Sequence, residues 1–452
     1  MTKPRRVLFM SKIITSRRIP SSQFERTAVF SGMALKLGAN LAKSAIKDIG
    51  RGQAPSISSM LLSTKNFEDI TSSLAHMRGA AMKLGQLMSM DDSDLLPPDF
   101  VAILARLRAS GYAMPSKQLR WVMNENWGSG WLKKFRNFDV RPFAAASIGQ
   151  VHRGILLDGR KVAIKVQFPN IKKSIKSDVN NLRLMAHASG MVPKNLDFEY
   201  YLGVCQAQLI SETDYLREAK YMQTFAHLAQ SETCITVPNV VVDFSTPEIL
   251  TMSFEEGCEF DSIEHFAPID REHIAYLLVT WTIREIFEFQ LVQTDPNFAN
   301  FRYDTDARQL KLLDFGATVI LPHSVLETYQ ELLQHILNND KDAVITALAK
   351  EKLMPDELPD RISNLLDKAL AIGLSELHEK DFFSFTDSKV FEVFNMETMQ
   401  EFARLVPPSL VPAELVLVQR KLLGLLFLLR KLAVNLPLKQ ILEHQFSSTM
   451  RS

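Results

Sequence analysis

Three polar side chains in the second half of the chain could hold a divalent cation against a phosphate. Asp295 and Asn300 lie five residues apart in "QTDPNFAN", and Asp314 follows a hydrophobic run in "LLDFGA". Carboxylate and amide oxygens, together with phosphate oxygens, suit the octahedral geometry of Mg²⁺. The same five-residue spacing joins the catalytic-loop aspartate and the second magnesium ligand of protein kinases. We therefore predict a catalytic role for Asp295 and metal ligation by Asn300 and Asp314.

A lysine in an apolar strand could supply positive charge to a nucleotide. Lys165 is flanked by apolar residues in "VAIKV", and an ammonium group buried there without a partner would be costly. In kinases the lysine of this motif contacts the α- and β-phosphates and pairs with a glutamate on a helix. The motif alone is weak, because it also fits a strand whose lysine faces water. Its order and spacing with Asp295, Asn300 and Asp314 make the joint pattern a strong one.

Strand and helix patterns place these residues in two lobes. Short strands are predicted within residues 143–168, where "LDGR" is the hairpin turn, and again within residues 237–254. Helices are predicted over residues 171–191 and 207–229, and the chain is mainly helical from residue 270 onward. The sequence therefore predicts an α+β fold with the bilobal layout of a protein kinase. The domains expected are 1–56 (a basic N-terminal segment with an amphipathic helix), 57–140 (a helical extension), 141–257 (a kinase-like N-lobe) and 258–452 (a helical C-lobe).

Six motifs follow one another along the chain: "KLGQ", "AAASIGQVH", "VAIKVQFP", "ETDYLREA", "QTDPNFANF" and "LLDFGA". In this combination the chain resembles the UbiB family of atypical kinases, also called the ADCK or AarF family, which is associated with ubiquinone biosynthesis. The motifs span residues 83–317, and "VQRKLLG" around Arg420 and Lys421 resembles the late helical segment of the family. The wording "QTDPN" is closest to the mitochondrial Coq-type branch and its bacterial relatives.

The resemblance implies regulatory contacts between the "KxGQ" helix and the helix of "ETDYLREA". The residues concerned are Lys83 and Gln86 on the first helix, and Glu212, Asp214 and Glu218 on the second. Lys83 and Gln86 are three residues apart and therefore project from one face. We assign Glu218 to Lys165 and the other two acids to the side of Lys83. Exchange of Glu212 and Glu218 between these partners stays open.

The resemblance also implies a nucleotide site with an unusual loop. Ala144, Ala145, Ala146 and Ser147 stand where kinases have a glycine-rich loop, and the hinge that contacts adenine would run from Met252 to Glu255. β-Carbons at three successive positions restrict the backbone and keep it from approaching the γ-phosphate as glycine would. We therefore expect ATP or ADP to bind with an altered preference. The alternative is that the alanines only form a tightly packed turn.

Two departures from ordinary protein kinases favour ATP hydrolysis over protein phosphorylation. Asn297 replaces the basic residue that commonly steadies the transferred phosphate, and in the family the "KxGQ" helix packs over the place of a peptide substrate. We predict a kinase-like ATPase that binds ATP or ADP with Mg²⁺ and supports ubiquinone biosynthesis at a membrane surface. A small-molecule or lipid kinase and a nucleotide-gated scaffold of a biosynthetic complex are the alternatives.

Charge bears on the partners of the chain. Residues 1–24 carry six basic residues and no acid, whereas the net charge of +1 gives no general field for nucleic acid. The helix predicted over residues 31–49 is basic and amphipathic, so it either packs on a domain or lies on an anionic bilayer. The partners expected are the nucleotide, an anionic membrane surface, and quinone-biosynthesis enzymes or lipid precursors, with a homodimer left open. The location expected is the bacterial cytoplasm, peripheral on the inner membrane, with the matrix face of the mitochondrial inner membrane as the alternative.

The most apolar helix predicted is unsuited to cross a membrane. Residues 415–429 carry Gln419, Arg420 and Lys421 near their centre. Each charge at that depth would cost roughly 2.5–3.5 kcal/mol. We therefore predict a core helix, so that any membrane contact would be peripheral.

Overall fold

The computed structural model describes residues 79–80, 83–84, 113–189, 197–351, 353–354, 357–393 and 412–449, and the single residues 398, 401 and 405. The basic N-terminal segment, the helix predicted over residues 31–49 and Gln86 lie outside the described residues. In the described part of the chain, no helix has the length and apolar character needed to cross a bilayer.

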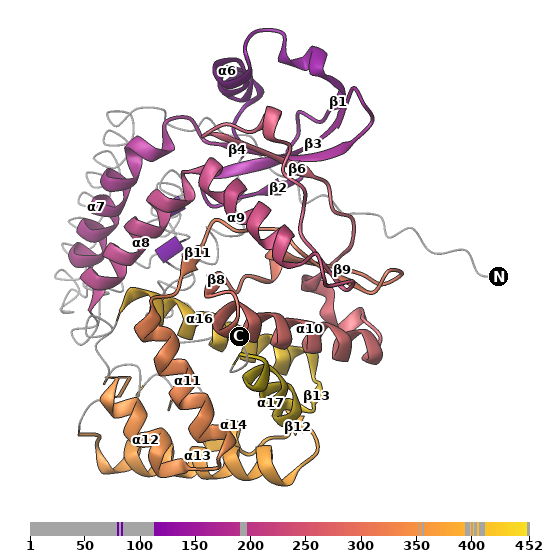
Figure 1. The fold of residues 1–452 in the computed structure, drawn as a ribbon. Helices are drawn as coiled ribbons and strands as arrows, with labels where there is room; N and C mark the ends of the chain where they lie inside the picture. Colours follow the sequence, from indigo (N-terminus) through magenta and orange to yellow (C-terminus); the bar gives the residue numbers. More distant parts are fainter. Residues whose placement is uncertain are drawn as a thin grey trace, which may run out of the picture.

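A five-stranded antiparallel sheet forms the N-lobe (Figure 1). Its strands are β1 (Phe135–Phe138), β3 (Gly149–Leu156), β4 (Lys161–Gln167) and β6 (Ile249–Ser253) in spatial order, with β2 (Ala144–Ala145) also paired to β3. β4 lies between β3 and β6, and six of its seven residues are buried. The predicted "LDGR" hairpin joins β3 to β4, and Gly159 in this turn has a φ of 94°, which favours glycine.

The sheet begins earlier in the sequence than expected. β1 precedes residue 141, where we expected the N-lobe to start, and it pairs with β3. Trp127, the last residue of α6 (Ser116–Trp127), stacks on Phe135 of β1 at 5.6 Å. Aromatic packing therefore joins α6 to the sheet, which the short "FRNF" pattern did not reveal. Within residues 237–254 only β6 is a full strand, because residues Val242–Phe244 form a 3₁₀ turn.

Three helices follow β4 on the side of the C-lobe. α7 (Ile171–Ser189) packs against α8 (Phe198–Glu212), and α9 (Tyr215–Leu228) packs against β6 (Figure 1). The single helix predicted over residues 207–229 is thus two helices. Asp214 ends the first run by accepting a hydrogen bond from the Arg217 N–H as the N-cap of α9. An aspartate in this position stabilises a new helix start.

The C-lobe is mainly helical, as predicted. Its principal elements are α10 (Pro268–Phe287), β8 (Leu291–Gln293), β9 (Phe301–Asp304), β10 (Gln309–Leu312), β11 (Thr318–Ile320), α11 (His323–Leu337), α12 (Lys341–Lys350), α13 (Asp360–Glu379), α16 (Ala413–Leu432) and α17 (Leu438–Thr449). α10 packs on α16 and α17 in the middle of the lobe, and α11, α12 and α13 lie farthest from the N-lobe sheet (Figure 1). The mixed upper lobe and helical lower lobe confirm the α+β, bilobal prediction.

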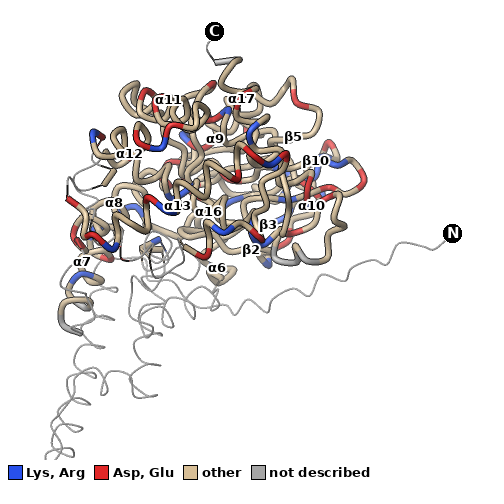
Figure 2. Tube along the Cα trace, turned by 90° about the horizontal axis from the view of Figure 1, so that it is seen from below, with Lys and Arg blue, Asp and Glu red and all other residues tan. Residues whose placement is uncertain are grey.

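α16 is the core helix that the sequence predicted at residues 415–429. Leu415, Leu417, Leu428, Leu429 and Leu432 are buried, and so are Arg420 and Lys421, at 6% and 8% exposure. Elsewhere, basic and acidic residues are intermixed along the described trace (Figure 2). This mixed pattern agrees with the near-neutral net charge.

Candidate active site

A buried ammonium group with two carboxylate partners lies between the lobes. The Lys165 Nζ atom, on β4, donates to Glu218 Oε1 at 2.6 Å and to Asp314 Oδ2 at 2.9 Å. Glu218 lies in the first turn of α9, and Asp314 follows β10. The side chains of Lys165 and Glu218 are only 7% and 2% exposed, whereas Asp314 is about one-third exposed. The cluster therefore joins the sheet, α9 and the C-lobe at one point.

Burial and charge set the ionisation of this cluster. Burial raises the pKa of Glu218 to about 7, although the Lys165 ammonium group opposes the shift. Burial also acts to raise the pKa of Asp314, but Lys165 and the Gly316 N–H outweigh it and hold the pKa below its ordinary value. For Lys165, burial is outweighed by Asp314 and Glu218, so that its pKa is raised. Asp314 is thus an ionised carboxylate that faces the pocket.

Glu212 has a different partner from Glu218. Its carboxylate forms an ion pair with Lys83, which is 1% exposed, and accepts a hydrogen bond from Ser147 Oγ at 2.7 Å. Burial lowers the pKa of Lys83, but Glu212 and Asp295 more than offset this and raise it. Among the described contacts, the arrangement is the one we favoured for Glu212 and Glu218, not the exchanged one.

Asp214 was expected beside Lys83, but the structure places it elsewhere. Its side chain is exposed and caps α9 through the Arg217 N–H at 3.0 Å. The reason is the helix break, which turns the residue after Glu212 and Thr213 away from the buried side. Gln86 was expected to join this contact and lies outside the described residues.

The alanine-rich loop is a short hairpin that contacts Glu212 and the segment around Gly79 through Ser147. Ala144 and Ala145 of β2 pair with Val151 and Gln150 of β3, and the Ala146 N–H donates to the Gly149 carbonyl at 3.0 Å. A Cβ atom on Gly79 would lie 3.1 Å from the Ser147 carbonyl oxygen. The helix of Gly79 and Lys83 therefore approaches the loop closely, and the Ser147–Glu212–Lys83 contacts fasten the loop to it.

The catalytic-loop candidates gather at the end of β8. Asn300 Nδ2 lies 3.4 Å from Asp295 Oδ2, and Arg420 Nη2 on α16 donates to Asp295 Oδ1 at 3.2 Å. The Asn297 side chain accepts a hydrogen bond from the Ala299 N–H at 3.1 Å, so it caps the short turn that carries Asn300. Asn297 is thus used locally, in the position where protein kinases have a basic residue.

The two hinge candidates lie where the sheet leads into the C-lobe. Met252 of β6 is buried and pairs with Ala163 of β4. Glu255 follows β6 and accepts a hydrogen bond from Ser253 Oγ at 2.6 Å, with Lys311 Nζ 3.7 Å away. This agrees with a connector between the lobes, and its contact with adenine remains a prediction.

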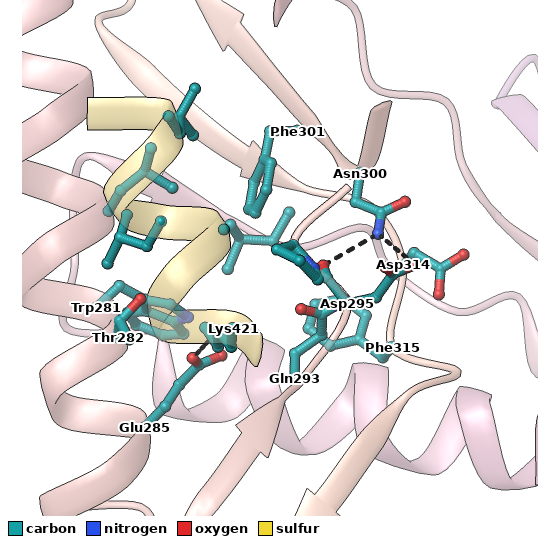
Figure 3. Close-up of a pocket in the computed structure, with 16 residues that line it drawn as sticks. Trp281, Thr282, Glu285, Gln293, Asp295, Asn300, Phe301, Asp314, Phe315 and Lys421 are labelled. Atoms are coloured by element: carbon teal, nitrogen blue, oxygen red, sulfur yellow. Dashed lines mark hydrogen bonds and ion pairs between the residues drawn. The ribbon is translucent and has the colours of Figure 1, made fainter. Parts of the chain in front are cut away.

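A pocket brings the expected catalytic aspartate, Asp295, and the two expected metal ligands together. Asp295, Asn300 and Asp314 all line it, together with apolar residues of α10 and α16 (Figure 3). No group of three or more His, Cys, Asp and Glu residues suited to a metal occurs in the described part of the chain. Mg²⁺ at a nucleotide needs no such group, since one or two protein oxygens and the phosphates suffice. An ionised Asp314 beside the Asn300 amide therefore fits this ion.

Three C-lobe residues in or beside the site were not predicted from the sequence: Arg420, Lys421 and Glu285. Arg420 contacts Asp295, and the adjacent Lys421 forms a buried ion pair with Glu285 of α10. The sequence did indicate that such partners exist, because two adjacent charged residues inside an apolar helix require buried partners. The sequence could not identify those partners, which lie 125 and 136 residues away.

Gly424 brings α16 against the catalytic loop. A Cβ atom there would lie 2.2 Å from Pro296 Cβ, next to Asp295. We expect Gly424→Ala to cost about 1–3 kcal/mol of stability through overpacking and to slow turnover, because the clash displaces Pro296. Urea denaturation and phosphate release measure the two effects. Gly203→Ala on α8 is the matched control: nothing lies within 4 Å of its new methyl group, so it should gain up to about 1 kcal/mol. Equal stability of both variants would contradict the close approach.

Comparison with known proteins places the chain in a family. Residues 106–348 match the ABC1 atypical kinase-like domain. The mitochondrial atypical kinase COQ8 of Saccharomyces cerevisiae is 32% identical over 438 residues, which cover 96% of this chain and 87% of that protein. Mitochondrial COQ8B of Rattus norvegicus is 38% identical over 331 residues, 73% of this chain and 63% of that protein.

The solved structure of the Mycobacterium tuberculosis protein Rv3197, in complex with erythromycin, has a similar fold. The TM-score is 0.58 at 23% sequence identity, and the match covers 83% of this chain and 94% of that one. Together, fold and site define an ATP-dependent enzyme of the atypical kinase class with a kinase-like bilobal fold. The chain belongs to the ABC1 atypical kinase-like family, which is the UbiB family that its motifs resembled.

Proposed function

We propose that this protein is a slow, Mg²⁺-dependent ATPase that supports ubiquinone biosynthesis at a membrane surface. The observation that carries the proposal is the cluster in which Lys165 meets both Glu218 and Asp314, with Asp295 and Asn300 lining the same pocket as Asp314. A lysine held by a helix glutamate and an ionised aspartate at a strand end is the arrangement that positions nucleotide phosphates in kinases.

Each residue of the cluster has a separate task in this proposal. Lys165 holds the α- and β-phosphates, and Glu218 fixes the Lys165 side chain. Asp295 accepts a proton from the attacking water or hydroxyl group, and Arg420 keeps its carboxylate oriented. Asn300 and Asp314 would hold Mg²⁺, which neutralises charge on the phosphate oxygens when bound.

Hydrolysis is favoured over transfer to a protein because the loop above the nucleotide is held in place. Ser147 is tied to Glu212 and through it to the buried Lys83. Asn297 offers no positive charge to a transferred phosphate. A small-molecule or lipid kinase remains the second candidate, since the same Asp295 could accept a proton from a small hydroxyl acceptor.

The biosynthetic role and the location come from the relatives. Their names, COQ8 and COQ8B with the word mitochondrial, support a link to ubiquinone and favour the mitochondrial matrix face over the bacterial inner membrane. The membrane contact is expected from residues 1–49, which lie outside the described residues.

Phosphate release by the full chain tests the proposed activity. We expect MgATP-dependent release that increases with anionic vesicles and with a phenol-like quinone precursor, and that Asp295→Asn abolishes. Deletion of residues 1–50 should remove the effect of vesicles and leave release without vesicles intact. Release that is unaffected by Asp295→Asn would contradict the assigned active site, and equal vesicle stimulation of the truncated protein would contradict the membrane segment.

The alanine-rich loop gives a test of nucleotide preference. Ala145 is exposed at the loop and has no positive φ, so Ala145→Gly would add conformations that let its N–H approach the γ-phosphate. We expect the ratio of ATP to ADP affinity to rise, with autophosphorylation in place of hydrolysis. Binding of both nucleotides and the melting temperature should be measured for Ala144→Gly, Ala145→Gly and Ala146→Gly. If each loses up to about 1 kcal/mol of stability with an unchanged affinity ratio, the loop is only a packed turn.

A further inference from the structure

Hydrogen bonds to backbone carbonyls hold the segment that follows Asp314. Residues 315–322 alone connect Asp314 to α11, whereas protein kinases have a longer loop here whose phosphorylation controls the site. On the C-lobe side, the Thr294 N–H and Oγ1 both donate to the Ala317 carbonyl, at 3.0 and 2.7 Å. Contacts of this kind must therefore fix the segment next to Asp314 in place of such a loop.

On the N-lobe side, one residue of α9 binds the same segment. Arg217 Nη1 donates to the Gly316 carbonyl at 3.2 Å, and Arg217 Nη2 donates to the Thr318 carbonyl at 2.7 Å. The guanidinium group also lies over the Tyr221 ring, 4.8 Å from the ring centroid and one helical turn further along α9. A guanidinium group is planar and carries its donors in a fixed fork. Two such bonds and an aromatic face therefore fix both the arginine and the segment.

The same turn of α9 also holds Lys165. Glu218, the residue after Arg217, accepts the hydrogen bond from Lys165 Nζ, and the centroid of the Tyr215 ring lies 5.5 Å from that atom. One helical turn thus contacts both the lysine expected to bind phosphate and the segment beside the aspartate expected to bind metal. A displacement of α9 would disturb both residues at once, whereas loss of the Arg217 side chain would release the segment alone.

We propose that Arg217 is a positioning residue for the metal site, and that through it the position of α9 controls the binding of Mg²⁺ at Asp314. The inference rests on the proposed function, in which Asp314 is a metal ligand, and adds a means of regulation to it. Coupling between two sites is reciprocal, so binding of the cation also stabilises α9 in this position. Any partner that moves α9 then changes the Mg²⁺ requirement of the protein.

Hydrogen exchange of the full chain without nucleotide tests the contact itself. Arg217→Gln should increase backbone exchange in residues 315–321, because two carbonyls of this segment lose their bond to the arginine and the segment opens more readily. Arg271→Gln is the matched control, since Arg271 Nη1 also donates to a backbone carbonyl, that of Leu432 at the end of α16, at 2.9 Å. That variant should leave exchange in residues 315–321 unchanged. Equal exchange there in the wild type and in Arg217→Gln would overturn the proposal, whether or not the protein hydrolyses ATP.

Titration with the non-hydrolysable ATP analogue AMPPNP tests the effect on the metal. The Mg²⁺ concentration for half-maximal binding should rise at least about fivefold in Arg217→Gln, the lower end of typical coupling between sites, while AMPPNP binding in EDTA stays the same. Arg217→Lys should restore part of the loss, because an ammonium group can bind one of the two carbonyls. Arg271→Gln should lower the unfolding midpoint, as Arg217→Gln does, and leave the Mg²⁺ requirement unchanged.

The same exchange experiment with Mg²⁺ and AMPPNP tests the link to α9. The ligand should slow exchange in α9 of the wild type, and this slowing should be lost in Arg217→Gln. A Mg²⁺ requirement that is unchanged in Arg217→Gln, or that rises equally in Arg271→Gln, would show a structural role only and overturn the proposal. Failure of the proposed function has a different result, since the wild type itself would then show no Mg²⁺-dependent binding, and both proposals would fall.

Discussion

Asp314→Asn should abolish Mg²⁺-dependent nucleotide binding while the protein stays folded. The Asp314 carboxylate is ionised and lines the same pocket as Asn300, and an amide in its place carries no charge for a divalent cation. The hydrogen bond from the Gly316 N–H to Oδ1 at 3.0 Å can be kept by asparagine. We expect turnover to fall by at least about a hundredfold, since a metal ion supplies several kcal/mol of charge stabilisation.

Thermal melting with and without nucleotide measures the binding part of this prediction. A ligand at a hundredfold excess over its Kd stabilises the folded state by about 2.7 kcal/mol, and the variant should lose this gain with MgATP. Asp340→Asn is the matched control, because Asp340 is an exposed N-cap of α12 and asparagine caps a helix as well as aspartate. An intact MgATP shift in Asp314→Asn would remove Asp314 from the site.

The local chemistry of the site could be read from the sequence because each motif lies on one short element. Lys165 is the fifth residue of β4, in which six of the seven residues are buried, and Asp314 lies two residues after β10, whose last three residues are buried. Strand ends of this kind expose a side chain while the preceding residues fix its position. The order and spacing of these motifs were enough to predict the family, and the family model and the relatives confirm that prediction.

The partners of these residues could be predicted only in part. Glu212 and Glu218 were both suitable for Lys165, since a continuous helix over residues 207–229 would have presented either one. The break at Thr213 and Asp214 decides the pairing, because it places Glu212 at the end of α8 and Glu218 in the first turn of α9. A cap of this kind competes with helix continuation by a small free energy that the sequence pattern does not reveal.

Contacts between remote segments were beyond the reach of sequence reasoning. The approach of α16 to the catalytic loop depends on one glycine, Gly424, and on Arg420 reaching Asp295. The sequence around Gly424 and Arg420 does not indicate which residues these two contact.

Lys165→Met should lower the free energy of unfolding by about 3–5 kcal/mol near pH 8. The change removes the ammonium group and leaves the Glu218 carboxylate, 2% exposed, without a counter-charge. Nucleotide binding should be lost as well, since Lys165 is the residue expected to contact the phosphates. Urea denaturation measures the first effect. Lys161→Met on the same strand is the matched control, because Lys161 is 65% exposed in a surface pair with Glu256, and such pairs contribute at most about 1 kcal/mol.

The loss of stability should depend on pH through Glu218. Burial already raises the pKa of Glu218 to about 7 while Lys165 opposes the shift, so removal of Lys165 must raise it further. A carboxyl whose pKa is higher in the folded than in the unfolded state binds more protons when folded, and stability then falls as pH rises towards the folded-state pKa. The deficit of Lys165→Met relative to the wild type should therefore be smallest near about pH 6 and should grow above about pH 7, by at most about 1.4 kcal/mol per pH unit. Relative to Glu218→Gln alone, the deficit of Lys165→Met with Glu218→Gln should be nearly independent of pH across this range, because position 218 titrates in neither protein. A deficit in the single variant that is equally large at both ends of the range would show that lost packing, not an unpaired carboxylate, is the cause.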